Sequence, residues 1–183
     1  SIRLGDRVII KRRGAQLGRL KQHDLIETRL DKNDSGVALA STELLVHRTV
    51  YLNTPALAIV HCHPRTAIAF SLSRDELVPI DNEASYLLKK IPVVTEEFAS
   101  GTPAMANKVA DALKNYKIIM LRGHGSFATG QTLETGDAFG FTSAADVFRE
   151  HARLSAFENA GQRDFDIGAL ADISDEAFDD LAP

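Results

Sequence analysis

The sequence predicts a single α/β domain whose strands and helices pack in layers. Short apolar runs typical of buried strands, such as residues 57–61 and 118–121, alternate with longer stretches of helical periodicity. The connections between these elements are short, and no repeat or linker divides the chain. Mixed elements with short connections favour one layered α/β domain, and 183 residues are enough to enclose a sizeable core.

Six strands and five helices are expected along the chain. Apolar or alternating runs place the strands at residues 7–11, 25–30, 57–61, 93–95, 118–121 and 126–129. Helical patterns place the helices at residues 43–52, 65–72, 83–89, 104–114 and 133–157. Helix-start signals support three of them: Ser41 and Thr42 precede the first, Thr102 with Pro103 the fourth, and Thr132 the last. The last is predicted to be amphipathic, because Ala138, Phe141, Ala145, Phe148 and Ala152 share one face.

The acidic composition after Gly161 divides the chain into two parts. Residues 1–160 are expected to form the folded domain, and residues 161–183 an acidic C-terminal tail. The tail also carries the apolar residues Phe165, Ile167, Leu170, Ile173, Phe178 and Leu181. We therefore expect the tail to pack on the domain or on a neighbouring subunit.

Charge and composition exclude several classes of protein. The net charge of −4 gives no basic footprint for DNA or RNA, and no apolar stretch or leader indicates a membrane or secreted protein. A single cysteine excludes an intrachain disulfide and fits a reducing cytoplasm, where we expect the protein to be located. The short basic cluster Lys11-Arg12-Arg13 has two interpretations, a solvated strand end or a small-anion site.

His61 and His63 close the apolar run that ends at Val60. Side chains alternate faces along a strand, so the two imidazoles point the same way and Cys62 points the other way, as a small core residue. Two adjacent imidazoles can share one metal ion, and imidazole suits zinc and its transition-metal neighbours.

His124 follows a second apolar strand and lies between Gly123 and Gly125, where a backbone can closely approach a ligand. Three histidines at two strand ends indicate a catalytic metal site with an open coordination position. The alternative to a catalytic site is a structural zinc site, but structural sites favour cysteine-rich ligand sets, which this sequence lacks.

Glu43 is the candidate group for proton transfer beside such a metal. Its position at a helix start has an ordinary explanation, since the helix dipole favours an acid there. Ser41 and Thr42 are ambiguous in the same way, because hydroxyls before a helix can cap it or help bind an anion. His47 lies one turn after Glu43 and is interpreted as an interior or supporting histidine.

In this order and spacing, Ser41-Thr42-Glu43, His61-Cys62-His63-Pro64 and Gly123-His124-Gly125 resemble the class II aldolase and adducin head family. The similarity is greatest to small L-fuculose-phosphate aldolases and runs from about Ser1 to Phe157. It implies a three-layer α/β/α domain with a central, mostly antiparallel sheet. It also implies a homotetramer with active sites between subunits.

The resemblance assigns roles to individual residues. It implies that His61, His63 and His124 bind Zn²⁺, or another divalent transition metal. It implies that Glu43 is the catalytic acid and base and can also ligate the resting metal. It further implies that Ser41 and Thr42 contact the substrate phosphate.

Three departures from the family pattern bear on the site. The helix and Gly-Asn segment that family members carry ahead of the region matching Ser1-Ile2-Arg3 have no counterpart in this sequence. The second phosphate segment, usually Ser/Thr-Gly, is Arg13-Gly14 here, so Arg13 binds phosphate by charge or indicates a different anionic substrate. A proton-donating tyrosine of characterised aldolases aligns near residues 81–82, which leaves that role unassigned.

The sequence thus predicts a zinc-dependent aldolase that reversibly cleaves a short phosphorylated ketose, such as L-fuculose 1-phosphate, to dihydroxyacetone phosphate and an aldehyde. Alternatives within the fold are a metal-dependent decarboxylase, a dehydratase and a 4-epimerase, and epimerases typically have aspartate in place of Glu43. A non-enzymatic adducin-like module is the alternative from another class, although such modules lose the three histidines.

Overall fold

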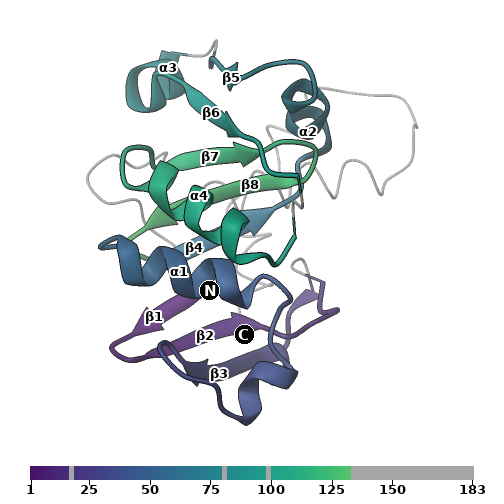
Figure 1. The fold of residues 1–183 in the computed structure, drawn as a ribbon, viewed down its shortest axis with the longest axis vertical. Helices are drawn as coiled ribbons and strands as arrows, with labels where there is room; N and C mark the ends of the chain where they lie inside the picture. The colour runs from purple at the N-terminus through teal and green to yellow at the C-terminus, as the bar shows by residue number, and fades with distance from the viewer. Residues whose placement is uncertain (17–18, 80–81, 98–99, 133–183) are drawn as a thin grey trace, which may run out of the picture.

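The computed structural model describes residues 1–16, 19–79, 82–97 and 100–132. These residues form one eight-stranded sheet with the strand order β3-β2-β1-β4-β8-β7-β6-β5 (Figure 1). All neighbouring strands are antiparallel except β6 and β7, which are parallel. The strands are β1 (Ile2–Leu4), β2 (Arg7–Lys11), β3 (Leu25–Arg29), β4 (Ala58–Cys62), β5 (Glu76–Leu77), β6 (Ile91–Val94), β7 (Ile118–Leu121) and β8 (Gly125–Gly130). The expected α/β fold with a mostly antiparallel central sheet is confirmed.

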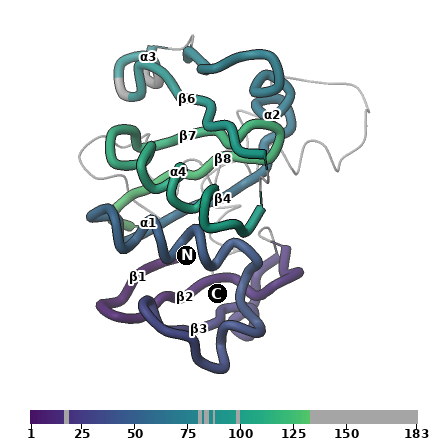
Figure 2. Tube along the Cα trace, viewed as in Figure 1, coloured from purple at the N-terminus to yellow at the C-terminus, as the bar shows by residue number. Residues whose placement is uncertain are grey.

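Helices α1 (Leu44–Asn53) and α4 (Pro103–Leu113) lie side by side on one face of this sheet (Figures 1 and 2). The shorter helices α2 (Arg65–Ser71) and α3 (Asn82–Leu88) follow β4 and β5 along the chain. Two 3₁₀ turns, Gln22–Asp24 and Ser35–Ala38, flank β3 among the described residues. The α1–α4 pair forms the helical layer that packs against the sheet.

The main core lies between the sheet and the α1–α4 pair. Ile59 of β4 and Phe127 of β8 are fully buried and face the two helices. Their helix partners include Val46, Val50, Tyr51, Met105 and Val109. Because side chains alternate along a strand, Ala58, Val60 and Cys62 of β4 lie on the opposite face, where they form a smaller cluster with Ile2. Cys62 is therefore a buried core residue, as the sequence predicts.

The helix starts also follow the sequence signals. The Thr102 side chain accepts a hydrogen bond from the Met105 backbone N–H, and Pro103 occupies the first turn of α4. Helix α1 begins one residue later than expected, with Glu43 as its N-cap residue. The Ser41 hydroxyl accepts a hydrogen bond from the Glu43 backbone N–H at 3.3 Å.

The six expected strands and the first four expected helices are present, with ends shifted by at most two residues. Strands β1 and β5 were not predicted, because runs of two or three residues carry no readable periodicity. A tight turn at Gly5 and Asp6 pairs β1 with β2, and Gly5 supplies the left-handed conformation with φ of 62°.

The helix expected at residues 133–157 and the tail at 161–183 lie outside the described residues. Among the described residues, no helix combines the length and apolar character that a bilayer span requires.

Replacing Thr102 with alanine tests the cap of α4. The Thr102→Ala variant leaves the Met105 N–H without its side-chain acceptor, and we expect the free energy of unfolding to fall by about 1 kcal/mol. Urea denaturation monitored by circular dichroism measures the change. Thr102→Ser should restore most of the loss, whereas the exposed Thr66→Ala in α2 should change stability by less than about 0.5 kcal/mol. Equal losses in Thr102→Ala and Thr66→Ala would contradict the capping role.

Candidate metal centre

The three candidate histidines meet where β4, β7 and β8 come together. His61 lies in β4, His63 follows that strand, and His124 lies in the turn between β7 and β8. Antiparallel pairing of β4 with β8 brings this turn beside the end of β4. One ligand atom from each histidine lies within 4.8 Å of the others, and the ring centroids are 4.8 to 5.0 Å apart. The sheet register therefore gathers all three imidazoles.

A backbone carbonyl fixes the tautomer of His61. Its Nδ1 lies 2.9 Å from the Ser126 carbonyl oxygen, which can only accept, so Nδ1 is the donor. The other nitrogen, Nε2, then carries the lone pair and lies at hydrogen-bond distance, 3.1 Å, from Nε2 of His63. Two nitrogens bound to one tetrahedral zinc are separated by about 3.3 Å, so this spacing suits a shared ion. Such hydrogen bonds to the non-ligating nitrogen are the usual support of metal-binding histidines.

The His61 ring is also held by stacking and burial. It lies parallel to the Phe127 ring, its cross-strand neighbour on β8, with 4.0 Å between centroids and 11° between planes. Burial lowers the pKa of His61 from 6.5 to about 3, despite the raising effect of the hydrogen bond to Ser126. His61 is therefore neutral near pH 7, the protonation state a metal requires.

Gly125 allows the two strands to approach at this point. A Cβ atom at residue 125 would lie 2.5 Å from the Cys62 carbonyl oxygen and 2.5 Å from Cδ2 of His63. It would also lie 3.2 Å from Cε1 of His61. Only glycine fits here without moving the Cys62 backbone or the imidazoles; the sequence predicted a close approach to a ligand, whereas the approach seen is between β8 and β4.

Arg122 and Ser71 hold the turn that carries His124. The Arg122 guanidinium donates to the Ser71 carbonyl oxygen at 2.6 Å and to the Thr95 hydroxyl at 2.9 Å. The Ser71 hydroxyl accepts from the Gly123 backbone N–H at 3.0 Å. Nδ1 of His124 is buried and has no hydrogen-bond partner among the described residues, which suits a metal ligand. Sequence reasoning missed both positioning residues, and only the adjacency of Arg122 to His124 could have indicated one of them.

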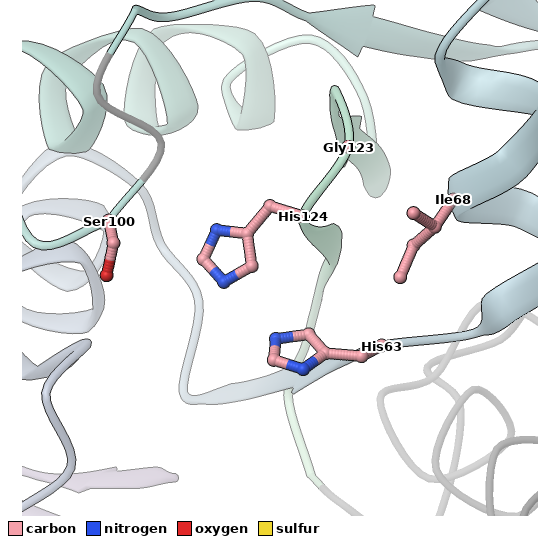
Figure 3. Close-up of a pocket in the computed structure, with 5 residues that line it drawn as sticks. All are labelled: His63, Ile68, Ser100, Gly123 and His124. Carbon is pink, nitrogen blue, oxygen red and sulfur yellow. The ribbon is translucent and has the colours of Figure 1, made fainter.

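Glu43 is 5% exposed and lies beside a pocket of about 400 Å³. Its Oε1 accepts a hydrogen bond of 3.0 Å from the Ser100 hydroxyl, while its Oε2 is buried without a partner among the described residues. Ser100 lines the pocket with His63, Ile68, Gly123 and His124, and Figure 3 shows the Ser100 side chain across an open space from the two histidines. Ser100, a residue that the sequence did not single out, therefore links the Glu43 carboxylate to a pocket lined by two of the three histidines.

The two candidate anion-binding segments lie next to each other. The Arg13 backbone N–H donates to the Leu39 carbonyl, and the Ser41 N–H donates to the Lys11 carbonyl, so the Arg13-Gly14 turn adjoins Ser41. Arg13 and Gly14 are exposed, as is Thr42, which follows Ser41. Lys11 was considered only within its basic cluster, yet its positive charge also contributes to the lowered pKa of His61. The two segments therefore form a basic edge of the domain, and the Lys11 charge is near enough to act on His61.

His47 lies where the sequence interpretation places it, in the interior of the domain. Its ring lies 6.0 Å from that of Phe127, and burial lowers the pKa of His47 well below 6.5. Tyr86, which lies near the family's tyrosine position in the sequence, is 82% exposed.

The donor set fits a divalent transition metal. Three imidazoles converge, the Ser126 carbonyl fixes the tautomer of His61, and the buried Nδ1 of His124 lacks a partner among the described residues. A His₃ set that opens on a pocket is typical of catalytic rather than structural metal sites, because a fourth position stays accessible. The arrangement can therefore polarise an oxygen of a bound substrate beside a buried carboxylate.

Comparisons with known proteins agree with this arrangement. The sequence model of the family described as Class II Aldolase and Adducin N-terminal domain matches residues 1–143. An L-fuculose phosphate aldolase from Methanococcus maripaludis is 30% identical over 134 residues, which cover 73% of this chain and 72% of that protein. The crystal structure of L-fuculose-1-phosphate aldolase from Thermus thermophilus superposes with a TM-score of 0.71 at 35% identity, covering 88% of this chain and 82% of that one.

Relatives with other activities match at similar identity. A 3-oxo-tetronate 4-phosphate decarboxylase from Haemophilus influenzae is 30% identical over 73% of this chain and 66% of its own length. A methylthioribulose-1-phosphate dehydratase from Acidiphilium cryptum is 32% identical over 70% of this chain and 67% of its own length. A stretch of 53 residues is 55% identical to a nitrate reductase from Klebsiella oxytoca, but it spans only 6% of that protein. Identity near 30% therefore fixes the family and leaves the substrate open.

Replacing Gly125 with alanine tests the close approach of β4 and β8. We expect Gly125→Ala to lower zinc affinity by about 100-fold or more, because the new methyl group displaces His63 and the Cys62 carbonyl. Zinc titration and the metal content of the purified protein measure the effect. Gly5→Ala is the control, since its site is open and its left-handed φ costs only about 1 kcal/mol of stability. Unchanged zinc affinity in Gly125→Ala would contradict this role.

The low pKa of His61 predicts an acid sensitivity of the chelator-treated protein. The unfolded chain binds a proton near pH 6.5 and the folded chain only near pH 3, so the free energy of unfolding falls as the pH drops between these values. The contribution is up to about 1.4 kcal/mol per pH unit. His61→Asn keeps a donor for the Ser126 carbonyl but cannot titrate, so its stability should fall less between pH 7 and pH 5. Urea denaturation with chelator measures the slopes, and equal slopes would contradict the assignment.

Proposed function

The chain belongs to the class II aldolase and adducin family, and on that premise we propose that it is a metal-dependent carbon–carbon lyase. Its substrate is a short phosphorylated ketose such as L-fuculose 1-phosphate. The products of the reversible cleavage are dihydroxyacetone phosphate and an aldehyde. The similarity to L-fuculose phosphate aldolases over more than two thirds of both chains supports this choice.

The observation that carries the proposal is the cluster of three imidazoles, two of which line a pocket whose Ser100 hydroxyl donates to the buried Glu43 carboxylate. His61, His63 and His124 would hold Zn²⁺ or a related divalent cation. Such a cation, when bound, stabilises the negative charge that develops on the substrate during cleavage, an effect worth several kcal/mol. Neutral ligands suit this task because they leave the full charge of the ion facing the substrate.

Glu43 would hold and move the proton that the reaction requires. Its Oε1 is occupied by Ser100, so Oε2 is the oxygen that would give a proton to the three-carbon fragment on cleavage and take it back on synthesis. Burial beside the pocket excludes water that would compete for this proton.

The basic edge beside Ser41 would bind the phosphate of the substrate. Ser41 and Thr42 offer hydroxyls ahead of α1, and Gly14 lets the backbone of the adjoining turn come close to an anion. Arg13 adds a positive charge where relatives usually carry a neutral hydroxyl.

We also propose that the protein is a cytoplasmic homotetramer with active sites between subunits. This proposal rests on the family resemblance, and native mass spectrometry tests the subunit number.

A decarboxylase of a phosphorylated sugar acid is the second candidate. Arg13 is the observation that favours it, since a guanidinium pairs with a carboxylate as well as with a phosphate. The similarity to a 3-oxo-tetronate 4-phosphate decarboxylase supports the same alternative, and the similarity to a dehydratase supports a third. A 4-epimerase is disfavoured by Glu43, and a non-enzymatic adducin-like module by the retained histidines.

Product analysis distinguishes these reactions. Zinc-loaded protein is incubated with L-fuculose 1-phosphate and related ketose phosphates, and released dihydroxyacetone phosphate is measured with and without chelator. We expect release that chelator abolishes and added zinc restores. Carbon dioxide from a phosphorylated 3-oxo acid, or water loss without chain cleavage, would instead identify the decarboxylase or the dehydratase.

Replacing Glu43 with glutamine tests its role in proton transfer. The Glu43→Gln variant keeps the shape of the side chain but cannot carry the proton, so we expect kcat to fall about 100-fold to 10,000-fold. Steady-state kinetics on zinc-saturated protein, with metal content measured in parallel, give the result. Full turnover with normal zinc content would contradict the assignment.

A further inference from the structure

We propose that Ser100 positions Glu43 for proton transfer, by holding one carboxylate oxygen so that the other faces the reaction. The inference rests on the proposed function, because it assigns a role to a residue that supports the proposed acid and base. Ser100 is distant from Glu43 in sequence, 57 positions along the chain, and is brought to it by the fold.

The hydrogen bond leaves the two carboxylate oxygens of Glu43 unequal. Oε1 accepts from the Ser100 hydroxyl at 3.0 Å, and Oε2 is buried with no partner among the described residues. This bond holds Oε1 beside Ser100 and so restricts rotation of the carboxylate. Restricting that rotation limits the positions that Oε2 can occupy, and catalysis depends steeply on such placement.

The Glu43 side chain does not cap its own helix. Glu43 is the N-cap residue of α1, yet its side chain makes no capping hydrogen bond. The favourable interaction of an acid with the helix dipole needs no such contact and does not determine where the carboxylate points. The carboxylate instead turns to Ser100, a residue that lines the pocket with His63 and His124 (Figure 3).

Both ends of this hydrogen bond are anchored in the same helical layer. Ser100 lies two residues before Thr102, which caps α4, and a Cβ atom at Gly101 would lie 3.6 Å from the Thr42 carbonyl oxygen. Helices α1 and α4 pack side by side, so the starts of both helices are fixed relative to each other (Figure 1). The bond therefore joins the segments that lead into two packed helices, and a catalytic group is best held by contacts to such supported positions.

A double-mutant cycle on zinc-saturated protein tests this role. We expect Ser100→Ala to lower kcat on the ketose phosphate by about 10-fold to 100-fold, the usual effect of losing a hydrogen bond to a charged group. KM and zinc content should stay within about twofold of wild type, because Ser100 acts on Glu43 and not on the substrate. In the Glu43→Gln background the same change should lower the residual kcat by less than about twofold, since no proton-carrying group is left to position.

Two control variants and the activity of the wild-type protein decide the outcome. Ser100→Thr keeps the hydroxyl and should recover most of the lost kcat, whereas Ser73→Ala, an exposed serine after α2, should behave as wild type. An unchanged kcat in Ser100→Ala, a rise in KM at constant kcat, or additive losses in the double variant would each overturn the positioning role. Zinc-loaded wild-type protein without lyase activity would overturn the proposed function itself. The two failures are therefore distinguishable.

Discussion

The register between β4 and β8 is the constraint on which the rest of the site depends. In this register His61 lies opposite Phe127, and Cys62 lies opposite Ser126. A slip of one residue would turn His61 to the other face of the sheet and bring Cys62 to its place. The same pairing supplies the Ser126 carbonyl that fixes the His61 tautomer and requires glycine at residue 125. Ligand orientation is therefore a property of the sheet backbone.

The sheet and the helical layer contribute different halves of the site. The sheet end gathers the imidazoles, and the segments before α1 and α4 bring the Glu43 carboxylate to the Ser100 hydroxyl, which lines the pocket with His63 and His124. The fully buried core of Ile59, Phe127 and Val50 joins the two layers, so movement of one relative to the other would break the packing of large apolar side chains. The distance between a metal and an acid is thus set by core packing.

The sequence predicted the parts of this protein that depend on local signals. Alternation along β4 predicted that His61 and His63 share a face, and the flanking glycines of His124 predicted a close backbone approach. Strand β1 has too few residues for a periodic pattern, so it was not foreseen. Ser71, Ser100 and Arg122 were missed because each acts through contacts with residues distant in sequence. No local pattern marks a serine that donates to a carboxylate 57 positions away.

The use of a main-chain acceptor for His61 bears on how such a site evolves. A carbonyl oxygen is present whatever amino acid occupies residue 126, so no single codon change there removes the support of His61 Nδ1. Mutational drift can therefore alter the surrounding pocket while metal affinity is retained. Descendants of such a protein can change substrate through other residues, such as Arg13 at the proposed phosphate site and Ile68 in the pocket. A metal site that tolerates sequence change in this way is expected to appear in relatives with different activities. The relatives named as an aldolase, a decarboxylase and a dehydratase, each about 30% identical to this chain, fit that expectation.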